Sequence, residues 1–370
     1  MLRSVASRTA RRLPLRAPAP AAAFASSAAP SADLDWATLG FAYQPTKTMI
    51  RYNWKDGSWD NGVMSTDFDV KIHSLSNVLH YGQGIFEGLK AFHCADGTVR
   101  TFNDIANVAR LRRGAERLLM PVVSEEMFRD GCDRVLRDNV EYIPPFGHGG
   151  AMYLRPFLFG HGGALGLGPA PQYSFCVVGC PVGAYYKGGL QAIDAMVVEN
   201  WDRAAPRGVG SIKVAGNYAP DVLPSSEAKK KGFPICLYLD AKTNSYVEEF
   251  STSNFIGITK QGSLVTPASD SILPSTTKGV LLQAARDVGL QVEERPLAWD
   301  EVPELAEVAA VGTAVVLTPI QSITRAEVRH EFGGMETVSK LYNAVTGIQT
   351  AELPDPHGYT RVVCEKPLQK

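Results

Sequence analysis

The sequence predicts a mixed α/β fold divided into two domains, and three observations support this prediction. The chain has 370 residues, enough for two domains or for one large α/β unit. Stretches with the alternating pattern of β-strands come between stretches with the period of amphipathic helices. The stretch 181–190, PVGAYYKGGL, is punctuated by proline and glycine and precedes a new series of strands, as a hinge would. We therefore expect a small N-terminal α/β domain over 31–180, an interdomain loop over 181–190 and a larger C-terminal domain over 191–370.

The first thirty residues differ in kind from the rest of the chain. They contain five arginines, no lysine and no acidic residue, and they are rich in alanine and serine. This composition is typical of an organelle transit peptide, and the alternative is a disordered basic tail without a targeting role. We expect residues 1–30 to be a disordered transit peptide for the mitochondrial matrix, with the plastid as the alternative.

The N-terminal part reads as strands interrupted by two helices. Strand patterns cover 49–54, 78–102, 151–159 and 173–182, with a hairpin at Asp96-Gly97 in the second of these. Asn103 is expected to cap a helix that ends at Pro121 and buries one face, made of Val108, Leu111, Ala115, Leu118 and Leu119. A second helix is expected from Ser124, with Met127, Val135 and Leu136 turned inward.

The C-terminal part reads as hairpins and one clear helix. A strand at 235–240 pairs with the next across AKTNS, and strands at 254–260 and 263–267 pair across Gln261-Gly262. A helix runs from about Thr276 to Val288 and stops at Gly289, a residue that favours helix C-termini. The strand-like stretch 307–311 then leads into GTAVV.

Composition argues against several classes of function. The formal net charge is −1, so the chain lacks the basic footprint of a nucleic-acid binder. No apolar run approaches the roughly 20 residues of a membrane span. The six cysteines show no CxxC or Cys/His ligand spacing. We therefore expect no nucleic acid, membrane or metal partner, and thiols kept in a reducing compartment.

The segment GVGSIKVAGNYAP predicts a reactive amine. Small residues flank Lys213, so its amine can approach a planar ligand, and burial there would favour the neutral form that condenses with an aldehyde. Tyr218 follows closely, and a second polar cluster, EEFSTSN, covers Glu248 to Asn254. Together these segments indicate a pyridoxal phosphate site. The plainer alternative for Lys213 is a solvated surface charge.

A nucleotide-binding loop is the first rival explanation of the glycine-rich segments. GVGSIK begins like GxGxxG, but Lys213 stands where the third glycine should be, and no acid follows at the end of a second strand. GHGGALGLG lacks the spacing as well and reads as a flexible loop. Neither segment contains GxxxxGK.

A phosphate group needs donors, and three places offer them. Arg110 lies in the helix NVARLRR, Thr276 and Thr277 open the helix of ILPSTTKGVLL, and Thr313 follows Gly312 in VGTAV. The free N–H groups and the dipole at a helix start favour an anion. Each residue also has a plainer alternative, namely a surface arginine, a simple helix cap and a strand residue.

Eight motifs follow one another along the chain: HYGQGIFEGLKAF, the Arg110 helix, MYLRP, CPVGAYYKGG, RAAPRGVGSIKVAGNYAP, VEEFSTSNF, ILPSTTKGVLL and VGTA. Their order resembles that of the branched-chain amino acid aminotransferases, which are fold-type IV pyridoxal phosphate enzymes. The resemblance spans roughly residues 51–320. It implies a homodimer whose subunit has a small N-terminal α/β sandwich domain and a larger C-terminal pseudo-barrel domain. It also implies reversible transfer of the amino group from L-leucine, L-isoleucine or L-valine to 2-oxoglutarate, giving 2-oxo acids and L-glutamate.

The resemblance also implies roles for residues around the cofactor. Lys213 matches the lysine that holds pyridoxal phosphate as a Schiff base and moves the proton. Tyr218 matches the tyrosine that hydrogen-bonds its phenolic oxygen. Glu249, rather than Glu248, matches the acid at the pyridine nitrogen, because the family has an acid five residues before the asparagine at 254. The residues that match phosphate contacts are Arg110, Thr276, Thr277 and Thr313.

For the substrate, the resemblance implies aromatic walls and a turn for the carboxylate. The aromatic matches are Tyr81, Phe86, Tyr153 and Tyr185, and core packing is their plainer alternative. Arg155 matches a polar neighbour, and Thr313-Ala314 matches the turn whose N–H groups receive the carboxylate. Tyr81 is expected near the subunit interface, where it reaches the partner's site.

One departure from the family pattern bears on redox control, and two rival functions compete with the aminotransferase interpretation. Where mammalian relatives carry a CxxC after the turn, this chain reads VVLT, so no thiol-based redox control is expected there. A D-amino acid aminotransferase or aminodeoxychorismate lyase would share the fold. A catalytically silent binding module is the second rival, and the presence of Lys213, Tyr218, Glu249 and Arg110 argues against it.

Overall fold

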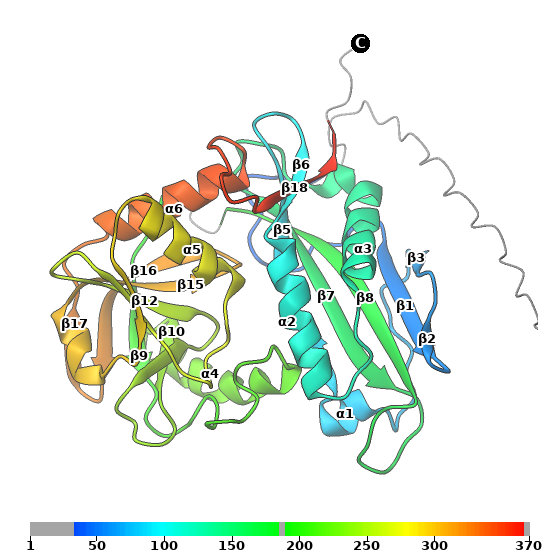
Figure 1. Cartoon of the computed structure of the whole chain (residues 1–370), viewed down its shortest axis with the longest axis horizontal. Coiled ribbons are helices and arrows are strands. Elements are labelled where there is room, and N and C mark those ends of the chain that lie inside the picture. The colour runs from blue at the N-terminus through cyan, green and yellow to red at the C-terminus, as the bar shows by residue number, and fades with distance from the viewer. Residues whose placement is uncertain (1–32, 185–188, 366–370) are drawn as a thin grey trace, which may run out of the picture.

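The computed structural model describes residues 33–184 and 189–365, which form two β-assemblies lying side by side (Figure 1). The predicted transit peptide at 1–30 lies outside the described residues, and so does part of the predicted interdomain loop, 185–188. The predicted division at 181–190 stays a prediction. Within the described ranges, no helix is long and apolar enough to cross a membrane.

The first assembly is an antiparallel sheet with the order β18-β6-β5-β7-β8-β1-β2, in which β3 pairs with β1 and β4 with β7. Its strands are β1 (Met49–Lys55), β2 (Ser58–Trp59), β3 (Val63–Ser65), β4 (Gly84–Phe86), β5 (Leu89–His93), β6 (Val99–Phe102), β7 (Ala151–His161), β8 (Gln172–Val182) and β18 (Thr360–Cys364). The short helix α1 (Asn77–Tyr81) precedes β4, and a 3-10 turn (Val140–Tyr142) follows the second long helix.

Two long helices cover this sheet, α2 (Asp104–Arg117) and α3 (Glu125–Asp138) (Figure 1). Their apolar faces join those of the strands in one core, in which Phe128, Leu136 and Phe175 are fully buried. Ser124 caps α3 by accepting a hydrogen bond from the N–H of Met127, as its side-chain type favours. The core fixes α2, and with it Arg110, against β4.

The second assembly contains a closed barrel. Its strands are β9 (Ile193–Val197), β10 (Ile235–Leu239), β11 (Val247–Phe250), β12 (Asn254–Thr259), β13 (Leu264–Pro267), β14 (Val292–Arg295), β15 (Leu305–Gly312), β16 (Val316–Arg325) and β17 (Val328–Glu331). The order β11-β10-β9-β16-β15-β12 returns to β11 through the pair Glu249↔Asn254, which closes the ring. Phe250, Phe255 and Leu237 belong to the core formed by these strands.

Helices on the barrel connect it to the first sheet. They are α4 (Val222–Lys230), α5 (Thr276–Asp287) and α6 (Glu336–Gln349), and 3-10 turns cover Ala215–Asn217, Ala219–Asp221 and Trp299–Glu304. One buried cluster joins Phe92 and Phe102 of the sheet to Leu281 of α5 and Leu341 of α6. This shared core fixes the junction between the assemblies, where the site lies.

The chain ends by returning to the first sheet, since β18 pairs antiparallel with β6. Arg361 of β18 reaches both long helices, with Nε 2.6 Å from Asp104 Oδ2 and Nη2 2.7 Å from Asp133 Oδ1. In Figure 1 this strand lies across the top of the first sheet, far in sequence from its neighbours.

Most predicted elements are confirmed, and three details are wrong. Residues 77–81 form α1 rather than strand, and Leu119 is 73% exposed. The helix ends before Leu119, whose φ of 52° turns its side chain outward, and Met120 fills the core instead. Asn103 precedes α2 but makes no side-chain cap. Its φ is 54°, and its Nδ2 donates to the carbonyl of Thr276 at 3.0 Å.

Candidate active site

The segment around Lys213 joins the edge of the first sheet. The N–H of Phe86 donates to the Lys213 carbonyl at 3.1 Å, and Val214 forms a bridge with Ile85. Ile212 and Val214 alternate with Lys213 and are buried in the core of the first sheet. Since neighbours in an extended segment point to opposite sides, burying these two residues turns the lysine toward the barrel.

The Lys213 amine is enclosed by aromatic rings. Its Nζ donates to the hydroxyl of Tyr218 at 2.6 Å and lies 4.6 Å from the centre of the Phe86 ring. Burial and, to a lesser degree, the positive charges of Arg110 and Arg155 lower the pKa of Lys213 to about 8, although the carboxylates of Glu87 and Glu249 act in the opposite direction. A neutral, nucleophilic amine is thus accessible near neutral pH.

Tyr218 keeps its proton in this site. Burial raises the pKa of Tyr218 to about 12, and the nearby Glu249 carboxylate acts in the same direction. The side chain of Asn217 fixes the turn by donating to the carbonyls of Val209 and Ile212 at 2.8 and 3.1 Å. The phenol is therefore a fixed hydrogen-bonding group beside the amine.

Glu249 lies on the rung that closes the barrel. Its Oε1 accepts from the N–H of Leu273 at 2.8 Å and is 2.5 Å from Nη2 of Arg203, while Oε2 accepts from Asn254 at 3.2 Å. Burial raises the pKa of Glu249 to about 7, against the attraction of Arg203. Glu248 points elsewhere, since its Oε1 accepts from Ser269 at 3.1 Å and from Ser271.

The predicted phosphate donors converge at the start of α5. Thr277 lies 3.4 Å from Thr313, measured between their Oγ1 atoms, and Nη1 of Arg110 donates to the Pro274 carbonyl at 3.1 Å. A small cavity here is lined by Thr276, Thr277 and Thr313. The first N–H groups of α5 and its dipole add donors to the same place.

The sequence reasoning missed the partner that orients Arg110. Nε and Nη2 of Arg110 donate to the two carboxylate oxygens of Glu87 at 2.7 and 2.6 Å, and Glu87 is fully buried. Asn107 donates to the same carboxylate at 2.7 Å. This pairing uses Nε and one N–H of Nη2, so other N–H groups of the guanidinium stay available for further acceptors. A glutamate inside the apolar motif GIFEGL was the available signal, because a buried charge needs a partner.

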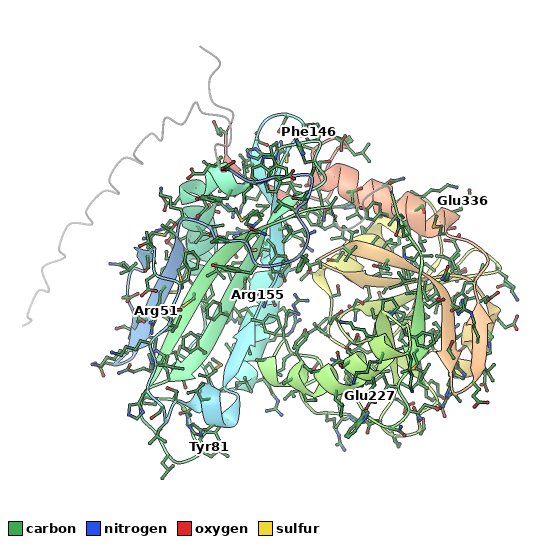
Figure 2. All side chains as sticks on the ribbon, turned by 180° about the vertical axis from the view of Figure 1, so that it is seen from behind. Arg51, Tyr81, Phe146, Arg155, Glu227 and Glu336 are labelled. Carbon is green, nitrogen blue, oxygen red and sulfur yellow. The ribbon has the colours of Figure 1, made fainter. Side chains whose placement is uncertain are left out.

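Phe86, which lies beside the Lys213 amine, groups with two other predicted substrate residues, Arg155 and Tyr153. The guanidinium carbon of Arg155 lies 4.8 Å from the Phe86 ring and 5.4 Å from the Tyr153 ring, and its Nη2 is 3.3 Å from the Tyr153 hydroxyl. Figure 2 shows Arg155 at the junction between the two assemblies. Its buried Nε has no hydrogen-bond partner among the described residues. The arrangement offers apolar walls with one cation among them.

Lys90 holds the turn at Thr313-Ala314 through a hydrogen bond. The turn joins β15 to β16, and Lys90 Nζ donates to the Ala314 carbonyl at 2.5 Å. Burial lowers the pKa of Lys90 to about 8. A carboxylate bound at this turn would therefore lie near the Lys90 amine, which is mostly protonated below about pH 8.

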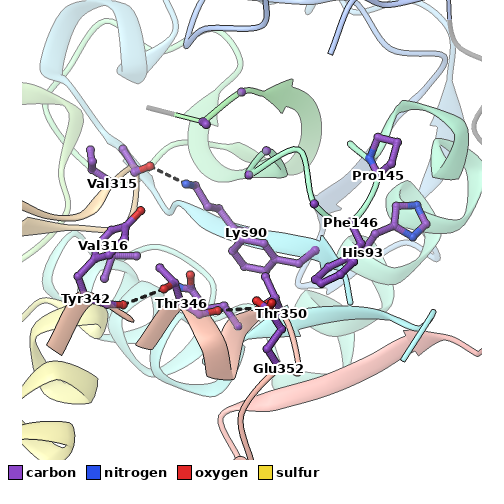
Figure 3. A pocket seen from close by; sticks show the side chains of 18 residues that line it. Lys90, His93, Pro145, Phe146, Val315, Val316, Tyr342, Thr346, Thr350 and Glu352 are labelled. Atoms are coloured by element: carbon purple, nitrogen blue, oxygen red, sulfur yellow. Dashed lines mark hydrogen bonds between the residues drawn. The ribbon is translucent and has the colours of Figure 1, made fainter. Parts of the chain in front are cut away.

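A larger cavity of about 390 Å³ adjoins this turn (Figure 3). It is bordered by Lys90 and His93 of β5, Phe146, Val315, and Tyr342 of α6. Lys213, Tyr218 and Glu249 do not line it. The cavity therefore adjoins the Thr313-Ala314 turn without being lined by Lys213.

One predicted aromatic residue is not brought into this cluster, and another is not among the residues that the structure describes. Tyr81 is 42% exposed, and its hydroxyl donates to the Leu165 carbonyl. In Figure 2 it lies at the far end of the first sheet from Arg155. Tyr185 lies outside the described residues.

The donor set fits pyridoxal phosphate. A buried amine, a carboxylate beside it and a helix start with an arginine match the aldehyde, the ring nitrogen and the phosphate of that cofactor. Buried polar atoms without a partner in the described residues, Nε of Arg155 and of Arg203 among them, also fit a site built around a ligand. The described residues contain no group of His, Cys, Asp or Glu that could hold a metal ion.

Known proteins resemble the chain over most of its length. Residues 84–323 match the family model described as amino-transferase class IV. A branched-chain-amino-acid aminotransferase of Haemophilus influenzae is 43% identical over 337 residues, which is 88% of this chain and 98% of that protein. The branched-chain amino acid aminotransferase 1, mitochondrial, of Humulus lupulus is 39% identical over 88% of this chain and 84% of that protein.

Solved structures share the fold. The branched-chain amino acid aminotransferase of Escherichia coli superposes with a TM-score of 0.73 at 28% identity, over 86% of this chain and 99% of that chain. The branched-chain amino acid aminotransferase of Thermobaculum terrenum, solved in its PLP-form, superposes over 87% of this chain and 100% of that chain, with a TM-score of 0.72 at 22% identity. The second likeness concerns the fold alone.

Proposed function

Because the chain belongs to the class IV aminotransferase family and is an aminotransferase, we propose that it transfers the amino group of branched-chain L-amino acids reversibly to 2-oxoglutarate. The products would be branched-chain 2-oxo acids and L-glutamate. The predicted α/β fold of type IV is confirmed by the structural relatives. The observation that carries the proposal is the buried Lys213 amine, which lies beside the Phe86 ring and whose lowered pKa of about 8 makes a neutral fraction available near physiological pH.

Class IV aminotransferases use pyridoxal phosphate, and we propose that this chain holds it between the sheet and the barrel. Arg110, Thr276, Thr277 and Thr313 would bind the phosphate, Tyr218 the phenolic oxygen and Glu249 the ring nitrogen, with Lys213 at the aldehyde. When bound, the cofactor supplies an electron sink for the charge that develops at the substrate Cα.

Lys213 would act as the acid and base of the reaction. Its neutral amine can take a proton from the substrate Cα and return it on the cofactor side, and its pKa near 8 suits both steps near neutral pH. Tyr218 would keep the amine in place through the contact of 2.6 Å. Burial of the amine among aromatic rings excludes water from the transfer.

The substrate would be oriented from two sides. The N–H groups of Thr313-Ala314 would receive the carboxylate that all substrates share, with Lys90 behind the turn. Phe86 and Tyr153 would pack against a branched aliphatic side chain. Arg155, held over both rings, would pair with the second carboxylate of 2-oxoglutarate or glutamate.

The visible absorbance of the purified protein tests this proposal. The protein loaded with pyridoxal phosphate should show the band of lysine-bound cofactor, which L-leucine should bleach and 2-oxoglutarate restore. D-Alanine and aminodeoxychorismate, the substrates of the rivals on this fold, should leave it unchanged. A Lys213→Ala variant that still transaminates, or a protein that stays colourless after loading, would refute the proposal.

We propose that the enzyme is a homodimer in which Tyr81 reaches the partner's site. Apolar side chains beside Tyr81 are exposed, among them Leu79 at 60% and Leu167 at 85%. Such a cluster favours burial against a second copy. Light scattering should show a dimer for the wild type, monomers for Leu79→Asp combined with Leu167→Asp, and a dimer for the control Val328→Asp, which changes an exposed apolar residue of β17.

We propose that residues 1–30 direct the protein to the mitochondrial matrix, with the plastid as the alternative. Relatives include proteins described as mitochondrial and as chloroplastic, and the arginine-rich composition without acids supports import. A fluorescent protein carrying these residues should collect in one of these organelles. Diffuse fluorescence would contradict the proposal.

A further inference from the structure

Arg203 is a buried arginine that lies against Glu249, on the segment leading from β9 to Lys213. Its side chain is 7% exposed and that of Glu249 5%, and Nη2 of Arg203 is 2.5 Å from Oε1 of Glu249. Charges so poorly exposed to water are tolerated only in pairs. The pair is therefore a built part of the site, although the sequence reasoning assigned no role to Arg203.

The backbone holds Arg203 in this place. Its Nη2 donates to the carbonyl of Ser271 at 2.6 Å and to that of Gly210 at 3.3 Å. A side chain at Gly210 would collide, since its Cβ would lie 2.1 Å from the Ser271 carbonyl oxygen and 3.0 Å from Nη2 of Arg203. Glycine at this position thus makes room for the guanidinium.

The two oxygens of Glu249 have different surroundings. Oε1 accepts from both Arg203 and the N–H of Leu273, whereas among the described residues Oε2 accepts only from the amide of Asn254, at 3.2 Å. A carboxylate oxygen has two lone pairs, so Oε2 keeps one for a further donor. One oxygen anchors the side chain, and the other stays available.

We propose that Arg203 is a positioning residue, which favours the ionised form of Glu249 and turns its Oε2 toward the nitrogen of the cofactor ring. The inference rests on the proposed use of pyridoxal phosphate. An ionised Glu249 can hold the ring nitrogen in its protonated form, in which the ring accepts electrons best. A neutral carboxyl would lose that attraction.

The charges around Glu249 make Arg203 the decisive partner. Burial raises the pKa of Glu249 to about 7, and Arg203 is the largest influence in the opposite direction, followed by the hydrogen bond from Leu273. Glu248 raises this pKa and Lys213 lowers it. The Glu249 charge in turn acts to raise the pKa of Tyr218 and of Lys278. Without Arg203, the remaining groups would leave Glu249 mostly protonated at neutral pH.

Infrared difference spectra of the cofactor-free protein test the inference directly. The protonated-carboxyl band of Glu249 is obtained by subtracting the spectrum of the matching Glu249→Gln protein, across a pH series. In the wild type the band should disappear with a midpoint near pH 7. In Arg203→Gln the midpoint should rise by at least about 1 unit, which is tenfold in the protonation equilibrium. Arg203→Lys, which keeps the charge, should stay near the wild type.

Arg207→Gln is the matched control, because Arg207 lies in the same segment and is exposed. Its midpoint should equal that of the wild type. An unshifted midpoint in folded Arg203→Gln would overturn the inference. If that variant does not fold, Arg203→Lys decides. A midpoint displaced by more than about 1 pH unit in Arg203→Lys would overturn the inference, because lysine keeps the positive charge that stabilises the carboxylate.

A second readout separates this inference from the proposed function. Titration of each cofactor-free protein with pyridoxal phosphate, followed by absorbance, should show about tenfold weaker binding for Arg203→Gln than for Arg207→Gln. If leucine fails to bleach the band while this difference holds, only the branched-chain substrate is wrong. If the cofactor does not bind at all, the proposed function fails and the infrared midpoint still reports on Arg203.

Discussion

Glu249 and Asn254 lie directly opposite each other on β11 and β12, and their side chains are hydrogen-bonded at 3.2 Å. This rung completes the ring of barrel strands. The carboxylate proposed for the ring nitrogen is therefore placed by the closure of the barrel rather than by a loop. A site on paired strands is held more firmly than one on a free loop.

Removing this contact should loosen both the barrel and the site. Asn254 donates to Glu249 and, at 3.0 Å, to the Leu273 carbonyl, and its side chain is buried. Asn254→Ala would leave these acceptors short of a partner, at a cost of about 1–3 kcal/mol in the free energy of unfolding. Urea unfolding of the cofactor-free protein measures this cost. Asn343→Ala, on α6, serves as a control, and equal effects of the two variants would contradict the role of the rung.

Removing one charge of the Glu87–Arg110 pair should destabilise the protein more than removing both. Glu87→Gln leaves the buried Arg110 charge without its counter-ion, which costs about 3–5 kcal/mol. Glu87→Gln combined with Arg110→Met removes both charges and should recover much of that loss, while binding of pyridoxal phosphate stays weak. Urea unfolding and cofactor titration measure the two effects.

The exposed pair Arg112–Glu116 provides the comparison for this prediction. Its side chains are 63% and 54% exposed, so Glu116→Gln should change stability by less than about 0.5 kcal/mol. Equal destabilisation by Glu87→Gln and Glu116→Gln would show that burial of the Glu87–Arg110 pair has no energetic consequence.

The rate at which the cofactor attaches to Lys213 should depend on pH through the amine. The pKa of Lys213 is lowered to about 8, so the neutral amine fraction rises as pH increases and is nearly complete above that value. Attachment measured by stopped-flow absorbance should speed up about tenfold between pH 6 and pH 7 and level off above about pH 8. In Arg155→Gln the plateau should move to higher pH, because Arg155 helps to lower this pKa. A wild-type rate that still rises at pH 10 would contradict the burial of the amine.

Lys90 should control substrate binding more than turnover. Lys90→Met removes the donor to the Ala314 carbonyl and a cation behind the turn, so KM for leucine and 2-oxoglutarate should rise about tenfold with little change in kcat. In the wild type, KM should rise above about pH 8, where Lys90 loses its proton. Lys90→Arg should retain most of the affinity. A fall in kcat at unchanged KM would point to a role in the chemical step instead.

Local patterns were enough to predict much of this molecule. The helix that starts at Thr276 and ends before Gly289, and the hairpin at Gln261-Gly262, depend on neighbours in sequence, and both are confirmed. The segment around Lys213 was recognisable because its small residues and its tyrosine stand close together. Such features carry their physical cause within a few residues.

The features that the sequence did not reveal depend on partners distant in the chain. Glu87 meets Arg110 only after β4 has packed on α2, and Arg203 meets Glu249 only after the barrel has closed. Asn103 has the side chain of a helix cap, but its oxygen does not accept from α2, and its Nδ2 donates instead to the Thr276 carbonyl in the first turn of α5. Tertiary contact overrode the local preference at each of these positions.

The return of β18 to the first sheet bears on how the protein is made. A ribosome releases a chain from its N-terminus onward, and N-terminal regions begin to fold first. Here the strand that pairs with β6, and the arginine that joins Asp104 to Asp133, belong to the last residues described. The edge of the first sheet and the start of the Arg110 helix therefore stay incomplete until β18 has been synthesised. The nascent polypeptide thus cannot finish its first sheet before the barrel that follows it in sequence has been made.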